Sequence, residues 1–502
     1  MRRFALAGLA LVAGPVAAQT SDPNSAAASI TAADVAHRIG VIADDSMMGR
    51  DTPSPGLEAT AKYVADQFRR FGLTPGGENG SWFQRYPITR RQLDLARSRV
   101  LLESEGVSTV ARLNRSARFL QGTVPEHAPR GPALLLGGAL TADAVAHMPL
   151  RDRMVLYVPD FSKPVDQTTA QVTRAIRLAA PKAVVVVANV DSVLYGQRIP
   201  RQSAARTSID LKLVSPPIVE VGEYAVASAL RSAHLDLHQV RASTAPVMRD
   251  VPGLALSVEL RDTVLLALTA PNTVGILEGS DPKLKQEYLV YSAHMDHIGI
   301  TPGQADSINN GADDDGSGTV GVVELAEAFS RAGARPRRSI VFLTVSGEEK
   351  GLWGSRYFSE HPTVPIRQVI ADLNIDMIGR NWPDTIVAIG KEHSDLGSTL
   401  ERVNRAHPEL GMTAIDDIWP EERFYFRSDH FNFARKGVPI LFFFNGVHPD
   451  YHQVTDSPDK INSEKEARIL RLLFYLGQEL GNAPLRPRWK PESYREIVED
   501  AS

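Results

Sequence analysis

The stretch YLVYSAHMDHIG, residues 288–299, joins an apolar run to a cluster of polar groups. Residues 288–293 are the aromatic and aliphatic types that are common in buried strands. His294, Asp296 and His297 follow directly, where the strand is expected to end. A hydrophobic strand that ends in imidazole and carboxylate groups predicts a sheet with polar chemistry at one edge.

Two further apolar runs end in acidic residues. Residues 339–345 (SIVFLTV) precede Glu348 and Glu349, and residues 369–375 (VIADLNI) precede Asp376. Such strand-like runs alternate with segments of helical periodicity, and this alternation predicts an α/β fold with a central sheet flanked by helices. The other elements expected here are strands at 385–389 and 438–444 and helices at 319–329 and 395–405. Because ligands of α/β sheets gather at the carboxyl ends of the strands, the polar groups are expected to converge there.

The composition of the chain restricts its chemistry. The 502 residues include 43% hydrophobic and 23% charged residues and no cysteine, and the net charge is −4. No basic stretch is interleaved with aromatic residues, so a nucleic-acid partner is not expected. Any metal ligands must be His, Asp and Glu, which suit zinc, manganese or calcium rather than thiolate chemistry.

The N-terminus has the pattern of a secretory signal. Arg2 and Arg3 precede an apolar run over 4–16, and the small residues Val16 and Ala18 complete a cleavage site. The run is shorter than the roughly 20 residues needed to span a bilayer. We expect cleavage after Ala18 and export to the periplasm or the medium, with no membrane partner afterwards.

The composition of the sequence and the elements it predicts change along the chain. Short strands and Pro-rich turns set one internal segment apart from the main sheet, and an amphipathic helix is expected over 57–71. Ser463 and Glu466 fit a capping box at the start of the last long helix. The expected segments are a signal peptide (1–18), the N-terminal part of the main domain (19–110), a small β-rich inserted domain (111–250), the main domain (251–484) and a loosely structured tail (485–502).

Three adjacent carboxylates, Asp313, Asp314 and Asp315, lie in the stretch NNGADDDGSG (309–318). Like charges repel, so either a solvated loop or a bound cation would accommodate them. A calcium loop of the EF-hand type does not fit, because Gly311 and Val322 would occupy its first and twelfth positions. A cation shared with the groups at the strand ends therefore remains one alternative, and a solvated loop the other.

Residue spacing suggests different tasks for neighbouring side chains. His294 and Asp296 share one side of an extended chain, so the carboxylate can hold the imidazole of a metal ligand. His297 would point to the opposite side, which favours a packing role. Glu348 and Glu349 cannot both point the same way, so one is expected to bind metal while the other serves as a base.

These segments resemble the co-catalytic di-zinc aminopeptidases, the group of bacterial leucyl aminopeptidase, aminopeptidase S and aminopeptidase Y. After NTVGILEGSDPK (272–283), six motifs follow in the family's order: SAHMDHIG, GADDDGSG, SGEEKGLWGSRYF, NIDMIG, RSDHFNFARKGVPILFF and YHQVTDSPDKIN. The resemblance implies a mixed central sheet. The inserted segment is similar to a protease-associated domain.

The resemblance also implies a set of metal ligands for two zinc ions per chain. Asp314 would bridge both ions, and Glu349 and Asp376 would bind different ions. A cis peptide would follow Asp314, while Asp313 and Asp315 would form hydrogen bonds within the loop. The complete set of implied ligands is His294, Asp314, Glu349, Asp376 and His452.

The remaining site residues that the resemblance implies would act on the substrate. Glu348 would be the general base, and Asp296 would brace His294. Tyr451 would polarise the scissile carbonyl, and Arg427 would lie near the substrate amine. The expected protein is an exported zinc aminopeptidase, which hydrolyses the first peptide bond of peptides with a free N-terminus through a metal-activated water. A glutaminyl cyclase-like enzyme with one zinc and a catalytically inactive, receptor-like relative are the alternatives.

Overall fold

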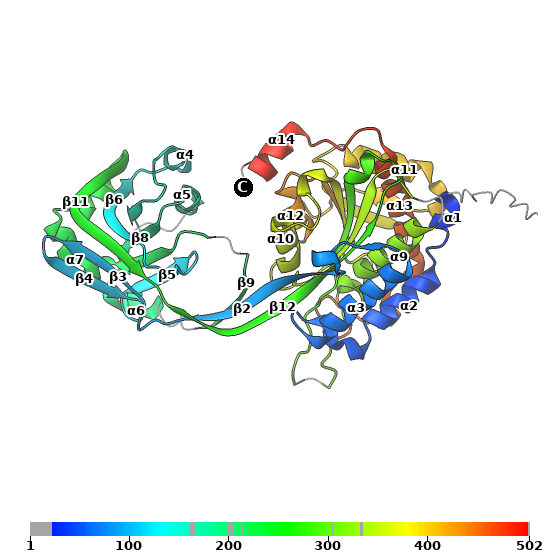
Figure 1. Ribbon diagram of the computed structural model, residues 1–502, viewed down its shortest axis with the longest axis horizontal. Coiled ribbons are helices and arrows are strands. Elements are labelled where there is room, and N and C mark those ends of the chain that lie inside the picture. The colour runs from blue at the N-terminus through cyan, green and yellow to red at the C-terminus, as the bar shows by residue number, and fades with distance from the viewer. Residues whose placement is uncertain are drawn as a thin grey trace, which may run out of the picture. The chain divides into compact units, whose positions relative to one another are not determined.

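The computed structural model describes residues 23–160, 167–198, 204–211, 214–303, 305–331 and 335–499 (Figure 1). The chain divides into two compact units, one formed by Met1–Tyr86 with Thr269–Ser502 and the other by Pro87–Leu268. The expected signal peptide, 1–18, lies outside the described residues. None of the helices within the described ranges is long and apolar enough to cross a membrane.

The first unit is built on a mixed sheet, as predicted. Four central strands run parallel to one another, whereas β12 is antiparallel to β14 and β16 is antiparallel to β18. A two-residue strand, β1 (Thr74–Pro75), pairs with β12 outside the main order. The order is β17 (Thr413–Ile415), β16 (Thr385–Ile389), β18 (Ile440–Phe443), β15 (Val369–Ile375), β13 (Tyr288–His294), β14 (Ser339–Val345), β12 (Asp262–Leu277) and β2 (Phe83–Leu93). The short strand β9 (Arg206–Ile209), which belongs to the second unit, pairs with the part of β2 that follows Tyr86.

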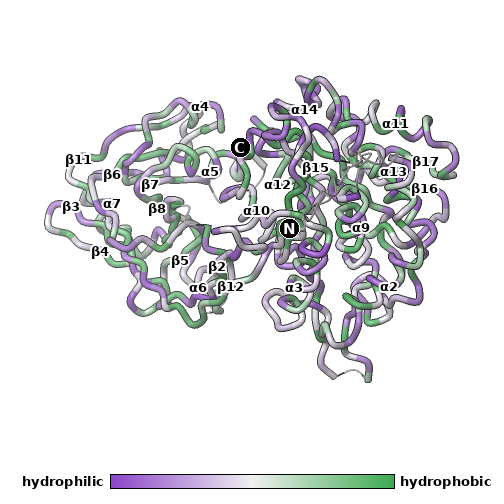
Figure 2. The backbone as a smooth tube through the Cα atoms, turned by 45° about the vertical axis from the view of Figure 1, so that its right-hand side comes forward, coloured by the Kyte–Doolittle hydropathy of each residue, from purple (hydrophilic) through white to green (hydrophobic). Residues whose placement is uncertain are grey.

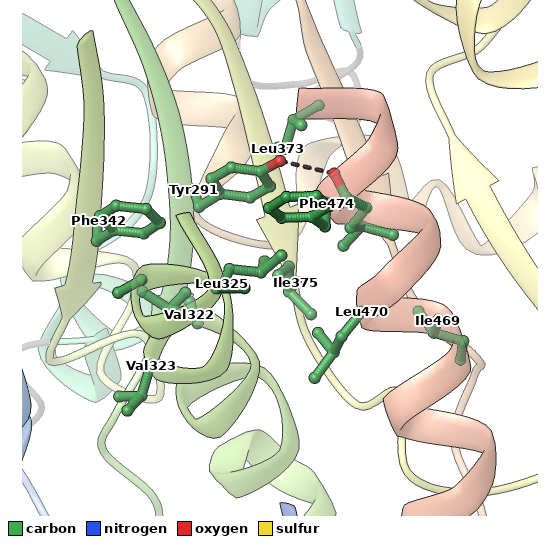
Figure 3. Packing of buried hydrophobic residues seen from close by; sticks show 14 of the residues in the cluster. Tyr291, Val322, Val323, Leu325, Phe342, Leu373, Ile375, Ile469, Leu470 and Phe474 are labelled. Carbon is green, nitrogen blue, oxygen red and sulfur yellow. Dashed lines mark hydrogen bonds between the residues drawn. The ribbon is translucent and has the colours of Figure 1, made fainter. Parts of the chain in front are cut away.

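Helices cover both faces of this sheet because its strands alternate their side chains between two hydrophobic cores. Tyr291 lies in the core beneath α9 and α13, and its chain neighbour Val290 lies in the opposite core. Figure 3 shows Tyr291 beside Phe342 and Phe474, with its hydroxyl donating to the carbonyl of Leu473 at 2.7 Å. The helices are α1 (Pro23–Ala27), α2 (Ala32–Ile42), α3 (Pro55–Arg70), α9 (Gly318–Ser330), α10 (Trp353–Glu360), α11 (Leu396–Ala406), α12 (His430–Ala434), α13 (Ser463–Asn482) and α14 (Pro491–Tyr494).

The second unit has its own mixed sheet and its own hydrophobic cores. Green, hydrophobic stretches of the chain run through the strands of both units in Figure 2. The strand order is β4 (Val107–Arg112), β3 (Arg99–Ser104), β11 (Pro246–Glu259), β6 (Arg130–Gly138), β7 (Met154–Val158), β8 (Ala183–Ala188), β10 (Ile218–Gly222) and β5 (Ala117–Gln121). The helices of this unit are α4 (Ala142–Ala146), α5 (Gln167–Leu178), α6 (Ser192–Arg198), α7 (Glu223–Ser232) and α8 (Leu237–Ala242).

The borders of the second unit lie outside the expected range 111–250. The hairpin of β3 and β4 belongs to this unit because β3 pairs with β11, which also pairs with β6. Helices accompany the strands, so the unit is less purely β than the sequence suggested. The similarity of this unit to a protease-associated domain stays a prediction.

Two local expectations near the C-terminus are wrong. Asn462, rather than Ser463, caps α13, and its side chain accepts a hydrogen bond from the backbone of Lys465. Glu466 is buried in the protein instead of reaching back to the cap. The described part of the tail, 485–499, is also packed on the domain, since Ile497 lies in a hydrophobic core and Trp489 bridges to Ser394.

Candidate metal centre

Three parallel strands bring the predicted ligands to one edge of the sheet. β13 lies between β15 and β14, so His294 at its end is flanked by Asp376 on one side and Glu349 on the other. The loop before α9 contributes Asp314, and the loop after β18 contributes His452. The structure thus collects all five predicted ligands, from segments that are distant in sequence.

One group of possible metal donors consists of His294, Asp314 and Asp376, which are all buried. Each offers one ligand atom, and the three atoms lie within 4.8 Å of one another. Nε2 of His294 is 3.4 Å from Oδ1 of Asp314 and 3.6 Å from Oδ1 of Asp376. Ser428 donates a hydrogen bond of 3.1 Å to the other oxygen of Asp376, which fixes that carboxylate.

A second group shares Asp314 and adds His297 and Glu349. Nδ1 of His297 is 3.0 Å from Oε1 of Glu349 and 3.5 Å from Oδ2 of Asp314. His452 faces the same two carboxylates, with Nε2 at 3.2 Å from Oδ2 of Asp314 and 3.2 Å from Oε2 of Glu349. The two oxygens of Asp314 therefore face different groups, as a bridging carboxylate requires.

The chemistry of these donors fits divalent cations. Oδ2 of Asp314, Oδ1 of Asp376 and Nε2 of His452 are buried without a hydrogen-bond partner in the described part of the chain. Buried polar atoms are rarely left without a hydrogen-bond partner. Imidazole nitrogens together with carboxylate oxygens are a donor set typical of zinc. Residues of both groups therefore fit two zinc ions.

The pKa values of the histidines reflect the density of negative charge. Burial disfavours the imidazolium of His294, but the carboxylates of Asp376 and Asp296 outweigh burial and raise the pKa of His294 well above its usual range. Burial likewise opposes the charged form of His452, while Asp314 and Glu349 raise its pKa to about 10. A bound cation would displace the protons that these charges attract.

Glu348 and Glu349 have different surroundings. Burial would raise the pKa of Glu349, but hydrogen bonds from His297 and His452 outweigh it and hold that pKa below the usual range. Burial raises the pKa of Glu348 well above the usual range, and nearby carboxylates add to this effect. Glu348 lines the same pocket as the ligands but belongs to neither donor group. It is therefore the carboxyl left available to carry a proton.

His297 differs from the expectation that it packs away from the site. β13 ends at His294, so strand alternation no longer governs the side chains that follow. The imidazole of His297 is buried and faces Glu349. The spacing of His294 and His297 was the only sequence signal for this second histidine.

Asp296 lies beside His294, but the closest contact is through its backbone. Nδ1 of His294 is 3.1 Å from the carbonyl oxygen of Asp296 and 3.7 Å from its carboxylate. The Asp296 carboxylate instead accepts a 3.2 Å hydrogen bond from the backbone of Glu348. Asp296 thereby links the ends of β13 and β14.

The three carboxylates of the acidic triplet have separate tasks. Asp313 bonds beyond its loop, contrary to expectation, since it accepts from the backbone of Gly379 at 2.7 Å. Asp315 bonds within the stretch 309–318, as expected, and also beyond it. Asp315 accepts from the backbones of His294, Met377 and Gly318 at 3.1, 3.2 and 2.8 Å. The peptide bond between Asp314 and Asp315 is cis, as the resemblance implied.

Sequence reasoning missed Asp456, which orients the bridging loop. Its carboxylate accepts hydrogen bonds from the backbone of Asp313 at 3.1 and 3.2 Å and of Asp314 at 3.1 Å. Asp456 lies in the motif YHQVTDSPDKIN, but its chemistry there is indistinguishable from that of a surface aspartate. Only the fold brings it under the triplet.

A pocket of about 450 Å³ opens beside the donors. Tyr451 and Arg427 both line it, together with aromatic and aliphatic side chains such as Phe424, Phe444 and Val447. The ring of Tyr451 stacks on His452 at a centroid distance of 3.9 Å. Arg427 is largely exposed, lies over the ring of Phe424 and pairs with Glu422 at 3.1 Å.

Comparison with known proteins identifies the segment that carries this site. Residues 272–477 match Peptidase family M28. Leupeptin-inactivating enzyme 1 of Streptomyces exfoliatus is 31% identical over 193 residues, which cover 38% of this chain and 39% of that protein. A probable leucine aminopeptidase of Arthroderma otae is 30% identical over 224 residues, 43% of this chain and 59% of that protein.

The match thus spans less than two thirds of the length of each of these two relatives. Among solved structures, an aminopeptidase from Aneurinibacillus sp. strain AM-1 has 18% sequence identity and a TM-score of 0.48, covering 94% of this chain and 98% of that one. All members of both donor groups, with His452 and Glu348, lie inside the matched segment. Residues 272–477, which carry the site, are therefore the part of this chain that matches peptidase family M28.

Proposed function

We propose that this protein is an exported, zinc-dependent aminopeptidase that hydrolyses the N-terminal peptide bond of peptides. One observation carries the proposal: two groups of largely buried donors share Asp314, and a half-buried glutamate that belongs to neither group lines the pocket beside them. Two metal sites with a common carboxylate are typical of hydrolytic two-metal centres. The relative named as a probable leucine aminopeptidase supports the same activity.

His294, Asp314 and Asp376 would hold one zinc, and Asp314, Glu349 and His452 the other, with His297 against Glu349. Two zinc ions bound there would supply Lewis-acid stabilisation of the developing negative charge and would acidify water. Glu348 would take the proton from the attacking water and deliver it to the leaving amine, a role supported by its raised pKa.

Tyr451 and Arg427 would act on the substrate. Tyr451 lines the pocket next to His452, where its hydroxyl would donate a hydrogen bond to the scissile carbonyl. Arg427, which lines the exposed side of the pocket, would orient the N-terminal part of the peptide. The apolar walls around Phe424 and Phe444 suit an apolar side chain of the first residue.

Export is supported by the pattern of residues 1–18, in which two arginines precede an apolar run and a small-residue cleavage site. Cleavage after Ala18 would release the protein to the periplasm or the medium. Comparing the N-terminal residue of the protein in the cell and in the exported fraction would test this part of the proposal.

The decisive experiment compares a series of aminoacyl chromogenic substrates with the same compounds acetylated on the amine. We expect hydrolysis of the free amines only, loss of turnover on chelation, recovery with zinc, and two zinc ions per chain by elemental analysis. Full activity with one tightly bound metal, or cyclisation of N-terminal glutamine, would indicate the cyclase-like alternative. A zinc-loaded protein that cleaves none of a broad substrate set would indicate the inactive, receptor-like alternative.

A further inference from the structure

Arg50 is a fully buried cation (0% exposed) that lies directly under the metal centre. Its guanidinium donates to backbone carbonyls only, within the described part of the chain. The acceptors are Met295 at 2.9 Å, Ile42 at 2.9 Å, Asn310 at 2.5 Å and Gly311 at 2.7 Å. Charge-assisted hydrogen bonds in a buried setting are stronger than neutral ones, so these contacts hold their acceptors firmly.

Three of the four acceptors, Met295, Asn310 and Gly311, lie on the two loops that carry His294 and Asp314, and the fourth, Ile42, ends α2. Met295 is between His294 and Asp296, and Gly311 precedes the triplet that contains Asp314. One planar guanidinium therefore sets the distance between the end of β13 and the loop before α9. Its positive charge also faces the carboxylates of Asp456, Asp314 and Asp296.

The backbone around Arg50 adopts an unfavourable conformation to make these contacts. Met48, Gly49 and Arg50 have φ values of 53°, 66° and 51°, so two residues with side chains occupy the left-handed region. Such residues persist only where the surrounding structure holds them. Here the backbone of Gly299 donates to the carbonyl of Gly49 at 2.9 Å, and that of His297 to the carbonyl of Arg50 at 3.4 Å.

We propose that Arg50 is a positioning residue of the metal centre, which fixes the spacing of the loops carrying His294 and Asp314. This inference rests on the proposed metal-dependent function, because the spacing matters only if both loops bind metal. A purely structural role would require burial and hydrogen bonding as well. It would not require three of the four bonds to converge on the two ligand-bearing loops.

Arg338 provides a matched control. It is also buried (1% exposed) and donates to the carbonyls of Leu480 at 3.2 Å and Ala483 at 2.5 Å and to the carboxylate of Glu287 at 2.7 Å. It precedes β14 at the end opposite to Glu348. Arg50→Met and Arg338→Met each remove a buried guanidinium. Both variants should therefore lose thermal stability, and only the first should disturb the metal centre.

The test measures metal binding and loop protection in the full chain. We would compare wild type with Arg50→Met, Arg50→Lys and Arg338→Met. For each protein we would measure the zinc affinity by chelator competition, the visible absorption after cobalt substitution, and the hydrogen exchange of residues 309–317 without metal. Arg50→Met should lose at least about tenfold in zinc affinity, change the cobalt spectrum and exchange faster, and Arg50→Lys should lie between it and wild type. Arg338→Met should keep the wild-type affinity and spectrum.

A second variant keeps the inference testable if Arg50→Met does not fold. A methyl group added at Gly49 would lie 2.5 Å from the carbonyl oxygens of Asn309 and Gly299, so Gly49→Ala shifts the same loops without removing a charge. Wild-type affinity and spectrum in a folded Arg50→Met or Gly49→Ala protein would overturn the positioning role. Failure of the wild-type protein to bind zinc at all would overturn the proposed function, and this inference with it.

Discussion

Glu348 and Glu349 are neighbours in the chain whose carboxylates meet opposite surroundings. Glu349 contacts two imidazoles that stabilise its charge, whereas Glu348 is buried among other carboxylates. The peptide geometry at the end of β14 sends the two side chains to different places, so one residue can bind metal while the other holds a proton. The division of tasks is therefore a property of position, not of residue type.

Substituting each glutamate by glutamine should separate these tasks. Glu348→Gln should retain both metals and lose kcat by about 10²–10⁴, because it removes only the proton-transfer group. Glu349→Gln should lose zinc affinity, because an amide is a weaker ligand than a carboxylate. Kinetics together with zinc content would check both expectations. Equal behaviour of the two variants, or the reverse order, would show that the roles are wrongly assigned.

His297 offers a second test at this scale. Its Nδ1 contacts Glu349 at 3.0 Å, and groups that orient a ligand commonly contribute about 10–100-fold to metal affinity. We expect His297→Gln to weaken zinc binding within that range, measured by chelator competition. A packing residue would instead lower the unfolding temperature and leave the affinity of the folded protein unchanged.

At the scale of elements, the strands were the most predictable part of the chain. β14, β15 and β16 begin and end at the predicted residues, because buried strands are marked by continuous apolar runs with polar residues at both ends. The capping of α13 was not predictable, since Asn462 and Ser463 are both good caps and only tertiary packing chooses between them.

Contacts between distant loops were beyond the reach of the sequence. Asp456 holds the backbone of Asp314 across 142 residues, and Arg50 holds Gly311 across 261. No local periodicity connects such pairs, and their residue types are common on surfaces. The ligands were predictable because each follows a recognisable strand or motif, whereas the groups that support them follow from the fold alone.

The first turn of α9 packs so closely that a side chain is excluded. A methyl group on Gly318 would lie 2.2 Å from the carbonyl oxygen of Ile375 and 2.4 Å from the carboxylate of Asp315. We expect Gly318→Ala to destabilise the protein by about 1–3 kcal/mol and to weaken zinc binding. The control is Gly40→Ala in α2, where nothing lies within 4 Å, which should stabilise the protein by about 0.5–1 kcal/mol. Chemical denaturation would measure both.

The central strand β15 carries a buried acid away from the ligands. Burial raises the pKa of the Asp372 carboxyl to about 8, although a 2.7 Å hydrogen bond from Ser292 favours its charged form. An unfolded aspartate loses its proton near pH 4, so the folded state binds one more proton between about pH 4 and about pH 8. The free energy of unfolding should therefore fall as pH rises through this window.

Asp372→Asn removes that titration. We expect the variant to lose less stability than wild type when the pH rises from about 5 to about 8, measured as the difference in unfolding temperature. Asp384→Asn, a change at an exposed position before β16, serves as the control and should follow wild type. An unchanged pH dependence in Asp372→Asn would mean that this carboxyl ionises normally in the folded protein.

At the scale of the whole molecule, the chain inserts one folded unit into another. Among the described residues, the hydrophobic cores of the first unit contain no residue of β3 to β8 or of β10 and β11. The hydrophobic cores of the second unit contain no described residue of the segment 272–477. Every predicted ligand lies in the first unit. The chemistry should therefore be separable from the inserted unit.

Deleting Pro87–Leu268 tests this separation. β2 and β12 are neighbours in the sheet, and the backbone of Val274 donates to the carbonyl of Trp82 at 2.8 Å, so a short Asn-Gly turn can join Tyr86 to Thr269. We expect the shortened protein to bind two zinc ions and to hydrolyse small aminoacyl substrates near the wild-type rate, while its preference among longer peptides changes. Activity on both substrate classes and zinc content would be measured on soluble protein. If the shortened protein is folded and zinc-loaded but inactive on small substrates, the inserted unit supplies part of the active site.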